Sequence, residues 1–392
     1  MKLKRWPKYT QTEIEAALNV LSSGKVNYWT GSECKAFEKE FANYIGSKFG
    51  VALANGTVAL EAAYKAIGLT NGDEIITTPR TFIATSMAAI NLGAKPIFAD
   101  VDINTGCISQ ATIEPLITKN TKAISVVHIA GWPADMENIC KIADKYNLYV
   151  IEDCSQAHGA KIKIGDIYKS VGSFGDLSCW SFCQDKIIST AGEGGMITTN
   201  DQRIYQKVWS YKDHGKSYQA VFNQKHTTGY KYLHEDLGSN YRMTEMQASI
   251  GRIQLKNLNE TQKTREKNAA ILISTLNELD LLRIPIPPKS VTHAWYKFYA
   301  YINEDKLSIN WSRDRIIDKI IEEGYPAYSG SCSEIYMEKC IYRLGMQPSQ
   351  RLNNARNLGE TSLAFLVDPL ISVAEMHEYA ENIKQILISA SK

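Results

Sequence analysis

The chain has 392 residues, of which 44% are hydrophobic and 22% are charged. This length and composition predict a large buried core and two domains, or one large domain with a satellite. Lys and Arg number 44 against 42 Asp and Glu, so the net charge of +2 gives no positive field that would hold nucleic acid or an anionic membrane. We expect neither partner.

The N-terminus and the cysteines place further limits on the class of protein. Residues 1–11 are basic but no apolar run follows them, and no stretch of about eighteen apolar residues occurs. We therefore expect a cytoplasmic protein. The eight cysteines include no Cys-x-x-Cys pair, and the seven histidines include no His-x-x-x-His pattern. We predict reduced thiols and no metal site.

Strands and helices alternate through the first part of the chain. Helical patterns cover residues 8–23, 35–45, 58–67, 82–92 and 133–146, and strand patterns cover residues 51–54, 74–78, 96–101, 123–127 and 148–153. This alternation predicts an α/β fold with a mostly parallel sheet covered by helices on both faces. Sites in such sheets form beyond the carboxyl ends of the strands.

Two further strands are predicted over residues 177–182 and 195–199, with Lys186 and a glycine-rich turn between them. As an isolated feature, Lys186 is most simply a solvated surface residue, because most lysines are exposed. Its neighbours in the sequence decide whether it has a chemical role.

In the C-terminal part, strands and helices alternate less regularly. Predicted elements are helices over residues 202–212, 244 to about 279, 313–323 and 374–388, and an aromatic strand over residues 295–302, with a polar loop before residue 235. The proline-rich stretch 284–288 marks the region of a domain boundary. We predict a large domain over residues 1–265 and a smaller α+β domain over residues 266–392.

Two polar segments lie at the carboxyl ends of predicted strands. Gly56 and Thr57 stand at a helix N-terminus, where free N–H groups and the helix dipole can bind an anion, although simple capping explains the same residues. Asp153 follows the apolar run 148–151 and either caps the next turn or serves a site. The local pattern leaves both alternatives open.

Four separated segments of the chain read NGT at 55–57, EDCSQAHG at 152–159, SFCQDK at 181–186 followed by GEGG at 192–195, and LGSNYRMTE at 237–245. Together they resemble the motifs of the DegT-type sugar-nucleotide aminotransferases, a branch of the fold-type I enzymes that use pyridoxal 5'-phosphate (PLP). Gln184 stands where most members have proline, but Lys186 is kept. The resemblance covers nearly the whole chain and implies the α/β fold of fold-type I transferases.

The resemblance also implies roles for individual residues. Lys186 would form the Schiff base with PLP, and the carboxylate of Asp153 would keep the pyridine nitrogen protonated, so that the ring can accept electrons. Phe82, which composition alone would place in the core, would lie on the pyridine ring, and Gln156 near the ring hydroxyl. The residues implied for the phosphate are Gly56, Thr57, Ser181 and Asn240, the last from a loop that enters the neighbouring subunit's site.

We therefore expect an aminotransferase that converts a ketone on a nucleotide-linked deoxysugar into an amine, in polysaccharide or O-antigen type biosynthesis. The expected amino donor is L-glutamate, and the expected unit is a homodimer with shared active sites. One alternative is a sugar dehydratase of the same fold, which would carry His in place of Lys186. Another is a nucleotide-binding Rossmann protein without PLP, which the absence of Gly-x-Gly-x-x-Gly and Gly-Lys-Ser/Thr motifs disfavours.

Overall fold

A seven-stranded sheet forms the centre of the computed structural model, which describes residue 3 and residues 6–392. Its order is β1-β9-β8-β5-β4-β2-β3. The strands are β1 (Phe49–Leu53), β2 (Glu74–Thr77), β3 (Lys95–Phe98), β4 (Thr121–Val127), β5 (Tyr149–Asp153), β8 (Leu177–Ser181) and β9 (Gly195–Thr199). From β3 to β8 neighbouring strands run parallel, whereas β9 is antiparallel to both β8 and β1. The predicted mostly parallel sheet is confirmed.

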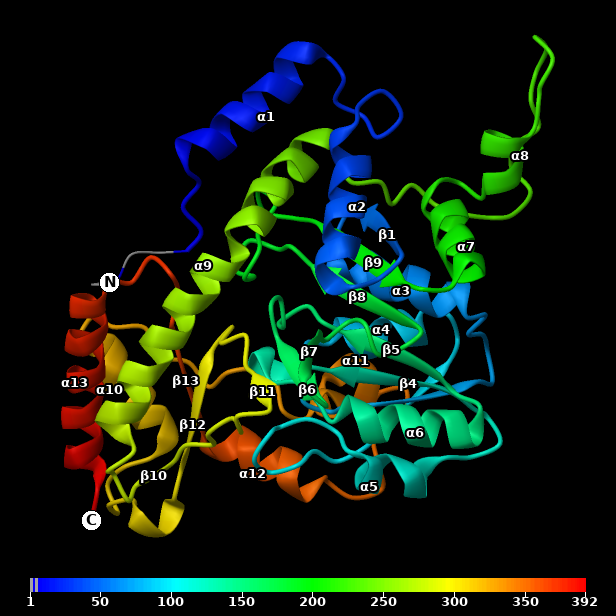
Figure 1. Cartoon of the computed structure of the whole chain (residues 1–392). Helices are drawn as coiled ribbons and strands as arrows, with labels where there is room; N and C mark the ends of the chain where they lie inside the picture. Colours follow the sequence, from blue (N-terminus) through cyan, green and yellow to red (C-terminus); the bar gives the residue numbers. More distant parts are fainter. Residues whose placement is uncertain (1–2, 4–5) are drawn as a thin grey trace.

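The two faces of this sheet are covered by different helices (Figure 1). The helices are α1 (Gln11–Ser23), α2 (Glu33–Ile45), α3 (Gly56–Ala66), α4 (Ala84–Ile90), α5 (Gln110–Ile113), α6 (Met136–Tyr146), α7 (Gln202–Lys212), α8 (Tyr218–Asn223), α9 (Glu245–Leu276), α10 (Arg313–Glu322), α11 (Lys339–Tyr342), α12 (Asn353–Thr361) and α13 (Val373–Ala390). Consecutive residues of a strand point to opposite faces. Accordingly, Ile75 of β2 packs in the core with α3, α4 and α7, and Ile76 packs with α6.

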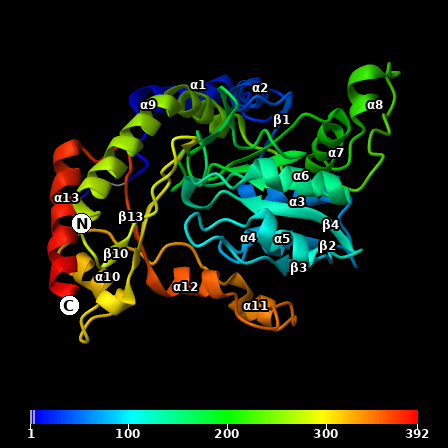
Figure 2. The same ribbon diagram turned by 60° about the horizontal axis from the view of Figure 1, so that its bottom comes forward.

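The C-terminal part packs around the long helix α9, which crosses the molecule diagonally in Figure 1. The second half of α9, α10 and α13 enclose a separate core with a three-stranded sheet ordered β10-β12-β13. These strands are β10 (Leu282–Arg283), β12 (Phe298–Ile302) and β13 (Ser362–Phe365). Figure 2 shows this part beside the large sheet, with α12 and α11 extending beneath it. The predicted division at residue 265 falls inside the continuous helix α9 and stays a prediction.

Several boundaries differ from the sequence prediction. The polar loop before residue 235 contains the short helix α8, which Ser217 caps by accepting the Ala220 N–H at 3.2 Å. The predicted strand 295–302 begins only at Phe298, because Trp295 has a left-handed backbone with φ 50°. A third small sheet of β6 (Lys161–Ile164), β7 (Ile167–Ser170) and β11 (Val291–Thr292) was not expected. None of the helices in the described part of the chain is long and apolar enough to cross a membrane.

Candidate active site

A cavity of about 1140 Å³ lies at the carboxyl ends of the parallel strands, where β4, β5 and β8 contribute Val127, Asp153 and Ser181. This is the position at which open α/β sheets bind ligands. The predicted residues that line it are Gly56, Thr57, Phe82, Asp153, Gln156, Ser181 and Lys186. Residues from segments more than 100 positions apart therefore meet in one cavity, as the sequence motifs implied.

Lys186 is held inside this cavity by its neighbours. Its side chain is 17% exposed, and Nζ donates a hydrogen bond to the Tyr296 hydroxyl at 3.3 Å and lies 3.6 Å from Oδ1 of Asp185. The backbone is fixed as well, since the Lys186 N–H donates to Cys183 at 3.0 Å and the Trp6 indole donates to the Lys186 carbonyl at 2.7 Å. The alternative of a solvated surface lysine is therefore wrong.

Asp185 and Tyr296 form a pair around that amine. The Tyr296 hydroxyl donates to Oδ2 of Asp185. Burial alone would raise the pKa of Asp185, but the Lys186 ammonium and the hydrogen bond from Tyr296 outweigh burial and lower this pKa. Burial, with the charge of Asp185, raises the pKa of Tyr296. At neutral pH Nζ of Lys186 thus lies beside both a carboxylate and a neutral phenol.

Asp153 ends β5 as a buried carboxylate, 4% exposed. Oδ2 accepts the Thr85 hydroxyl at 2.8 Å, and Oδ1 accepts the Ser155 N–H at 3.2 Å. No Lys or Arg in the described residues forms an ion pair with it. A buried carboxylate needs a compensating charge or several hydrogen bonds. The site can therefore accept a cationic group from a ligand, such as the protonated nitrogen of a pyridine ring.

Gln156 is oriented by a single strong contact. Its Oε1 accepts the Ala130 N–H at 2.7 Å, and the side chain is 8% exposed. Ala130 has a left-handed backbone with φ 57°. With the oxygen occupied, the amide nitrogen is the donor that a ligand in the cavity can use.

The N-terminus of α3 forms a cradle against the end of β8. Asn55 caps the helix by accepting the Val58 N–H at 3.0 Å, and the first residues of α3, Gly56 and Thr57, face the cavity. A Cβ on Gly56 would lie only 2.7 Å from the Cβ of Ser181. Glycine thus permits a close approach of two backbones, and free helix N–H groups beside a serine hydroxyl suit a phosphate.

Phe82 lines the same cavity with 68% of its surface exposed. The alternative that it belongs to the core is wrong. A flat aromatic ring open to a cavity can stack on a planar ligand. Together with the amine, the carboxylate and the anion cradle, it gives a donor set that fits PLP.

Asn240 does not line this cavity. It is exposed, and its loop is fixed beside β1, because the Tyr241 N–H donates to Lys212 at 3.0 Å and the Ala54 N–H donates to Tyr241 at 2.9 Å. Its predicted role in the neighbouring subunit's site stays a prediction.

Comparison with known proteins identifies the family of this chain. The family model described as DegT/DnrJ/EryC1/StrS aminotransferase family matches residues 7–384. The chain belongs to this family. Family members are aminotransferases that use PLP, so the predicted family, enzyme class and cofactor are confirmed.

Three relatives illustrate the likeness. A solved aminotransferase from Psychrobacter cryohalolentis is 48% identical, with a TM-score of 0.96 and 99% of each chain covered. GDP-perosamine synthase of Escherichia coli O157:H7 is 36% identical over 85% of this chain and 86% of its own. A UDP-N-acetyl-3-dehydro-α-D-glucosamine 3-aminotransferase of Acidithiobacillus ferrooxidans is 40% identical over 70% of this chain and 69% of its own.

The residues that sequence reasoning did not assign are Tyr296, Asp185 and Thr85. Asp185 adjoins Lys186 in the motif, and this adjacency was an available signal. Tyr296 comes from a segment 110 residues further along the chain, and no local pattern connects it with the lysine.

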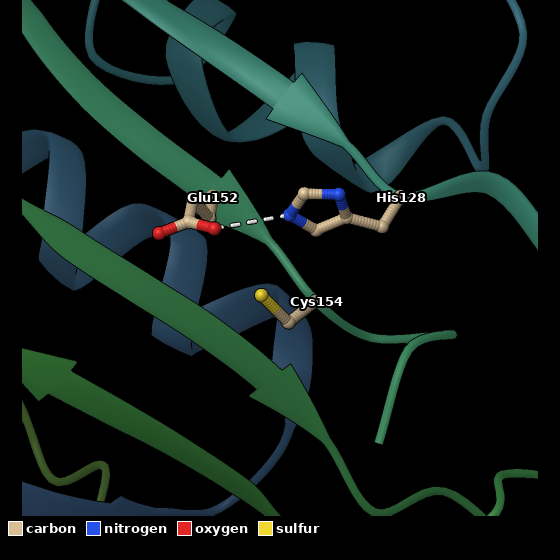
Figure 3. A group of neighbouring side chains, drawn as sticks. All are labelled: His128, Glu152 and Cys154. Carbon is tan, nitrogen blue, oxygen red and sulfur yellow. Dashed lines mark hydrogen bonds and ion pairs between the residues drawn. The ribbon is translucent and has the colours of Figure 1, made fainter. Parts of the chain in front are cut away.

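One buried group of possible metal ligands lies beside the site but has another explanation. His128, Glu152 and Cys154 approach one another at the ends of β4 and β5 (Figure 3). His128 Nδ1 accepts the Ala134 N–H at 3.0 Å, so the ring proton lies on Nε2 and is donated to Glu152 at 3.1 Å. Glu152 also accepts three N–H groups of the 172–175 segment. Neither histidine nitrogen keeps a free lone pair, so the group is a structural network. The expectation that the chain has no metal site stays a prediction.

Proposed function

We propose that this aminotransferase converts a ketone on a nucleotide-linked deoxysugar into an amine, with L-glutamate as the amino donor. The observation that carries this proposal is the enclosed amine of Lys186 in one cavity with the buried carboxylate of Asp153 and the cradle at Gly56. GDP-perosamine synthase and the UDP-N-acetyl-3-dehydro-α-D-glucosamine 3-aminotransferase support the substrate class, because both names include a sugar linked to a nucleotide. A cavity of about 1140 Å³ also leaves room for a sugar beside a cofactor.

The residues that would hold PLP follow from the fit of the donor set. We propose that Lys186 anchors it covalently, that Gly56, Thr57 and Ser181 bind its phosphate, and that Asp153 faces its pyridine nitrogen. Phe82 would stack on the ring. When bound, PLP supplies an electron sink for the bond electrons of the donor Cα. Gln156 would donate to the ring hydroxyl.

Lys186 would have a second task after the donor displaces it from its anchor. Its amine would take the proton that leaves the Cα of glutamate, as a general base within the cavity. Tyr296 and Asp185 would hold this amine in place. The Tyr296 hydroxyl accepts a hydrogen bond from Nζ, Asp185 lies within ion-pair distance of Nζ, and Tyr296 and Asp185 are hydrogen-bonded to each other. A lysine so restrained loses little entropy when it reaches the reacting atom.

We propose a homodimer in which Asn240 serves the phosphate site of the neighbouring chain. Its exposure and its position outside the cavity of its own chain support this proposal. We further propose a cytoplasmic enzyme of polysaccharide or O-antigen type sugar biosynthesis, with a large domain over 1–265 and a small domain over 266–392.

The proposal is tested by incubating the PLP-loaded enzyme with L-glutamate and a panel of 3-keto and 4-keto nucleotide-linked deoxysugars. Mass spectrometry should detect an aminated product for at least one sugar. Lys186→Ala should lose activity by about 10²-fold or more, since general acid/base catalysis alone is worth about 10² to 10⁴. The control Lys141→Ala, whose side chain is 64% exposed, should keep it. A Lys186→Ala enzyme that retains more than roughly a tenth of the turnover would contradict the assignment.

A further inference from the structure

A second, smaller cavity of about 30 Å³ lies behind one wall of the catalytic cavity. Lys297 and Tyr299 line both cavities, so these two side chains belong to the wall between them. The small cavity is also lined by Arg80, His293 and Tyr301, to which no role has been given above. None of its lining residues is acidic.

Arg80 is the central feature of this cavity. Its side chain is 1% exposed, Nη1 donates to Oγ of Ser333 at 2.8 Å, and the buried Nη2 has no hydrogen-bond partner in the described residues. The guanidinium carbon lies 5.2 Å from the ring centre of Tyr299 and 5.9 Å from that of Tyr301. Such cation–π contacts offset part of the cost of burying a cation but supply no counter-charge.

Two more basic side chains lie near this cavity: Arg283 contacts the Tyr301 ring, and Lys297 lines the cavity itself. Arg283 lies 4.5 Å from the ring centre of Tyr301, and its Nη2 is also buried without a hydrogen-bond partner in the part of the chain described. Lys297 forms no ion pair with any described residue, and burial lowers its pKa. Arg80 and Lys297 thus line a cavity that has no carboxylate in its wall, and Arg283 lies against Tyr301 of the same wall.

The nearby carboxylates already have other partners. Asp102 accepts the N–H groups of Asn104 at 3.0 Å and Thr105 at 2.8 Å, and Asp368 forms an ion pair with Arg265 at 3.0 Å. Asp185 is bound to Tyr296. The protein therefore does not itself supply the negative charge that Arg80 requires.

His293 adds a neutral hydrogen-bond donor to the lining of the small cavity. His293 Nδ1 accepts the Trp295 N–H at 2.8 Å, so its ring proton lies on Nε2. Burial lowers the pKa of His293 to about 3, which keeps the ring neutral at physiological pH. An N–H group of this kind can donate to an anion but adds no charge.

We propose that this cavity is a binding site for a halide-sized inorganic monoanion, of which chloride is the representative, held by Arg80 and Lys297. The volume of about 30 Å³ is enough for a small ion such as a halide. The anion neutralises the buried guanidinium behind the catalytic cavity. This site does not depend on the proposed sugar substrate.

Bromide is the probe for this site, because it replaces chloride and scatters anomalously. Crystals of the PLP-loaded enzyme grown in sodium bromide should show an anomalous peak inside the cavity, in contact with Arg80 Nη2. Chloride, compared with gluconate at equal ionic strength, should raise the Tm of the same holoenzyme by roughly 1–3 °C, as ligand binding to the folded state does.

Arg80→Met removes the cation while keeping an apolar side chain of similar length, and it should abolish both the peak and the chloride effect. The control Arg203→Met removes an arginine whose side chain is 89% exposed and should keep both. Absence of a bromide peak in the wild-type cavity overturns the proposal even where Arg80→Met fails to fold. A chloride effect on Tm that is equal in Arg80→Met and in the wild type overturns it as well.

Discussion

Gly56→Ala tests whether the N-terminus of α3 must lie directly against β8 to form the cradle. The added Cβ would lie 2.7 Å from the Cβ and 3.3 Å from the Cα of Ser181. Carbon atoms in contact prefer about 3.5–4.0 Å, so helix and strand must separate by roughly 1 Å. Side-chain rotation cannot relieve the overlap, because both Ser181 atoms are fixed by the backbone of a buried strand. We expect a loss of about 1–3 kcal/mol in the free energy of unfolding and weaker PLP binding.

Urea unfolding gives the first quantity, and titration of the apoenzyme with PLP gives the second. The control Gly229→Ala places its Cβ 3.9 Å from Oγ1 of Thr227 and should change stability by less than about 0.5 kcal/mol. Adding Ser181→Gly to Gly56→Ala removes the atom that is struck, so the two changes should couple by roughly 1 kcal/mol. Wild-type stability and PLP affinity in Gly56→Ala, or strict additivity in the double variant, would refute the reasoning.

Three further predictions concern charge, acid stability and assembly. Asp153→Asn keeps the size but removes the charge, so PLP should still bind while turnover falls by about two orders of magnitude. Burial, and after it the charges of Lys186 and Arg265, lower the pKa of His158 from 6.5 to about 3. His158 therefore stays neutral in the folded state while the unfolded state takes up a proton below pH 6.5, so stability is lost as the pH falls from 6.5 toward 3. His158→Phe should remove about 2 kcal/mol of this loss between pH 7 and pH 5 in urea unfolding. Chains with Lys186→Ala and chains with Asn240→Asp, each inactive alone, should regain activity when refolded together, because one site of the hybrid dimer carries neither change.

Each of these predictions has a contradicting result. Equal loss of PLP binding and turnover would make Asp153 a purely structural residue. An acid-induced loss of stability that is the same in His158→Phe and in the wild type would show that this histidine is not buried and neutral. Hybrid dimers that form by native mass spectrometry but keep parental activity would show that Asn240 does not serve the neighbouring site.

The sequence predicted the position of a residue in the fold wherever that residue begins or ends a regular element. Asp153 could be placed because an apolar run ends there, and the register pairs it with Val127 of β4 and Cys179 of β8 at one edge of the sheet. Gly56 and Thr57 could be placed because they open a helix. In these cases a local period of two or 3.6 residues determines where the side chain lies.

The contacts that restrain Lys186 could not be predicted in this way. Tyr296 comes from a loop before β12, and Trp6 reaches the Lys186 carbonyl from 180 residues away in the sequence. Such contacts depend on how the C-terminal part packs on the large sheet, and no periodicity reports that. For the same reason no local pattern in the sequence indicates that Arg80 is buried, although only 1% of the residue is exposed.

The covalent anchor is the central claim, and borohydride reduction of the PLP-loaded protein tests it most directly. The visible absorption band of the bound cofactor should bleach on reduction, and mass spectrometry of the digested protein should find the reduced cofactor on the peptide that contains Lys186. The account would be contradicted by a protein that gains no visible band with added PLP, or by a label on another lysine of the cavity such as Lys297.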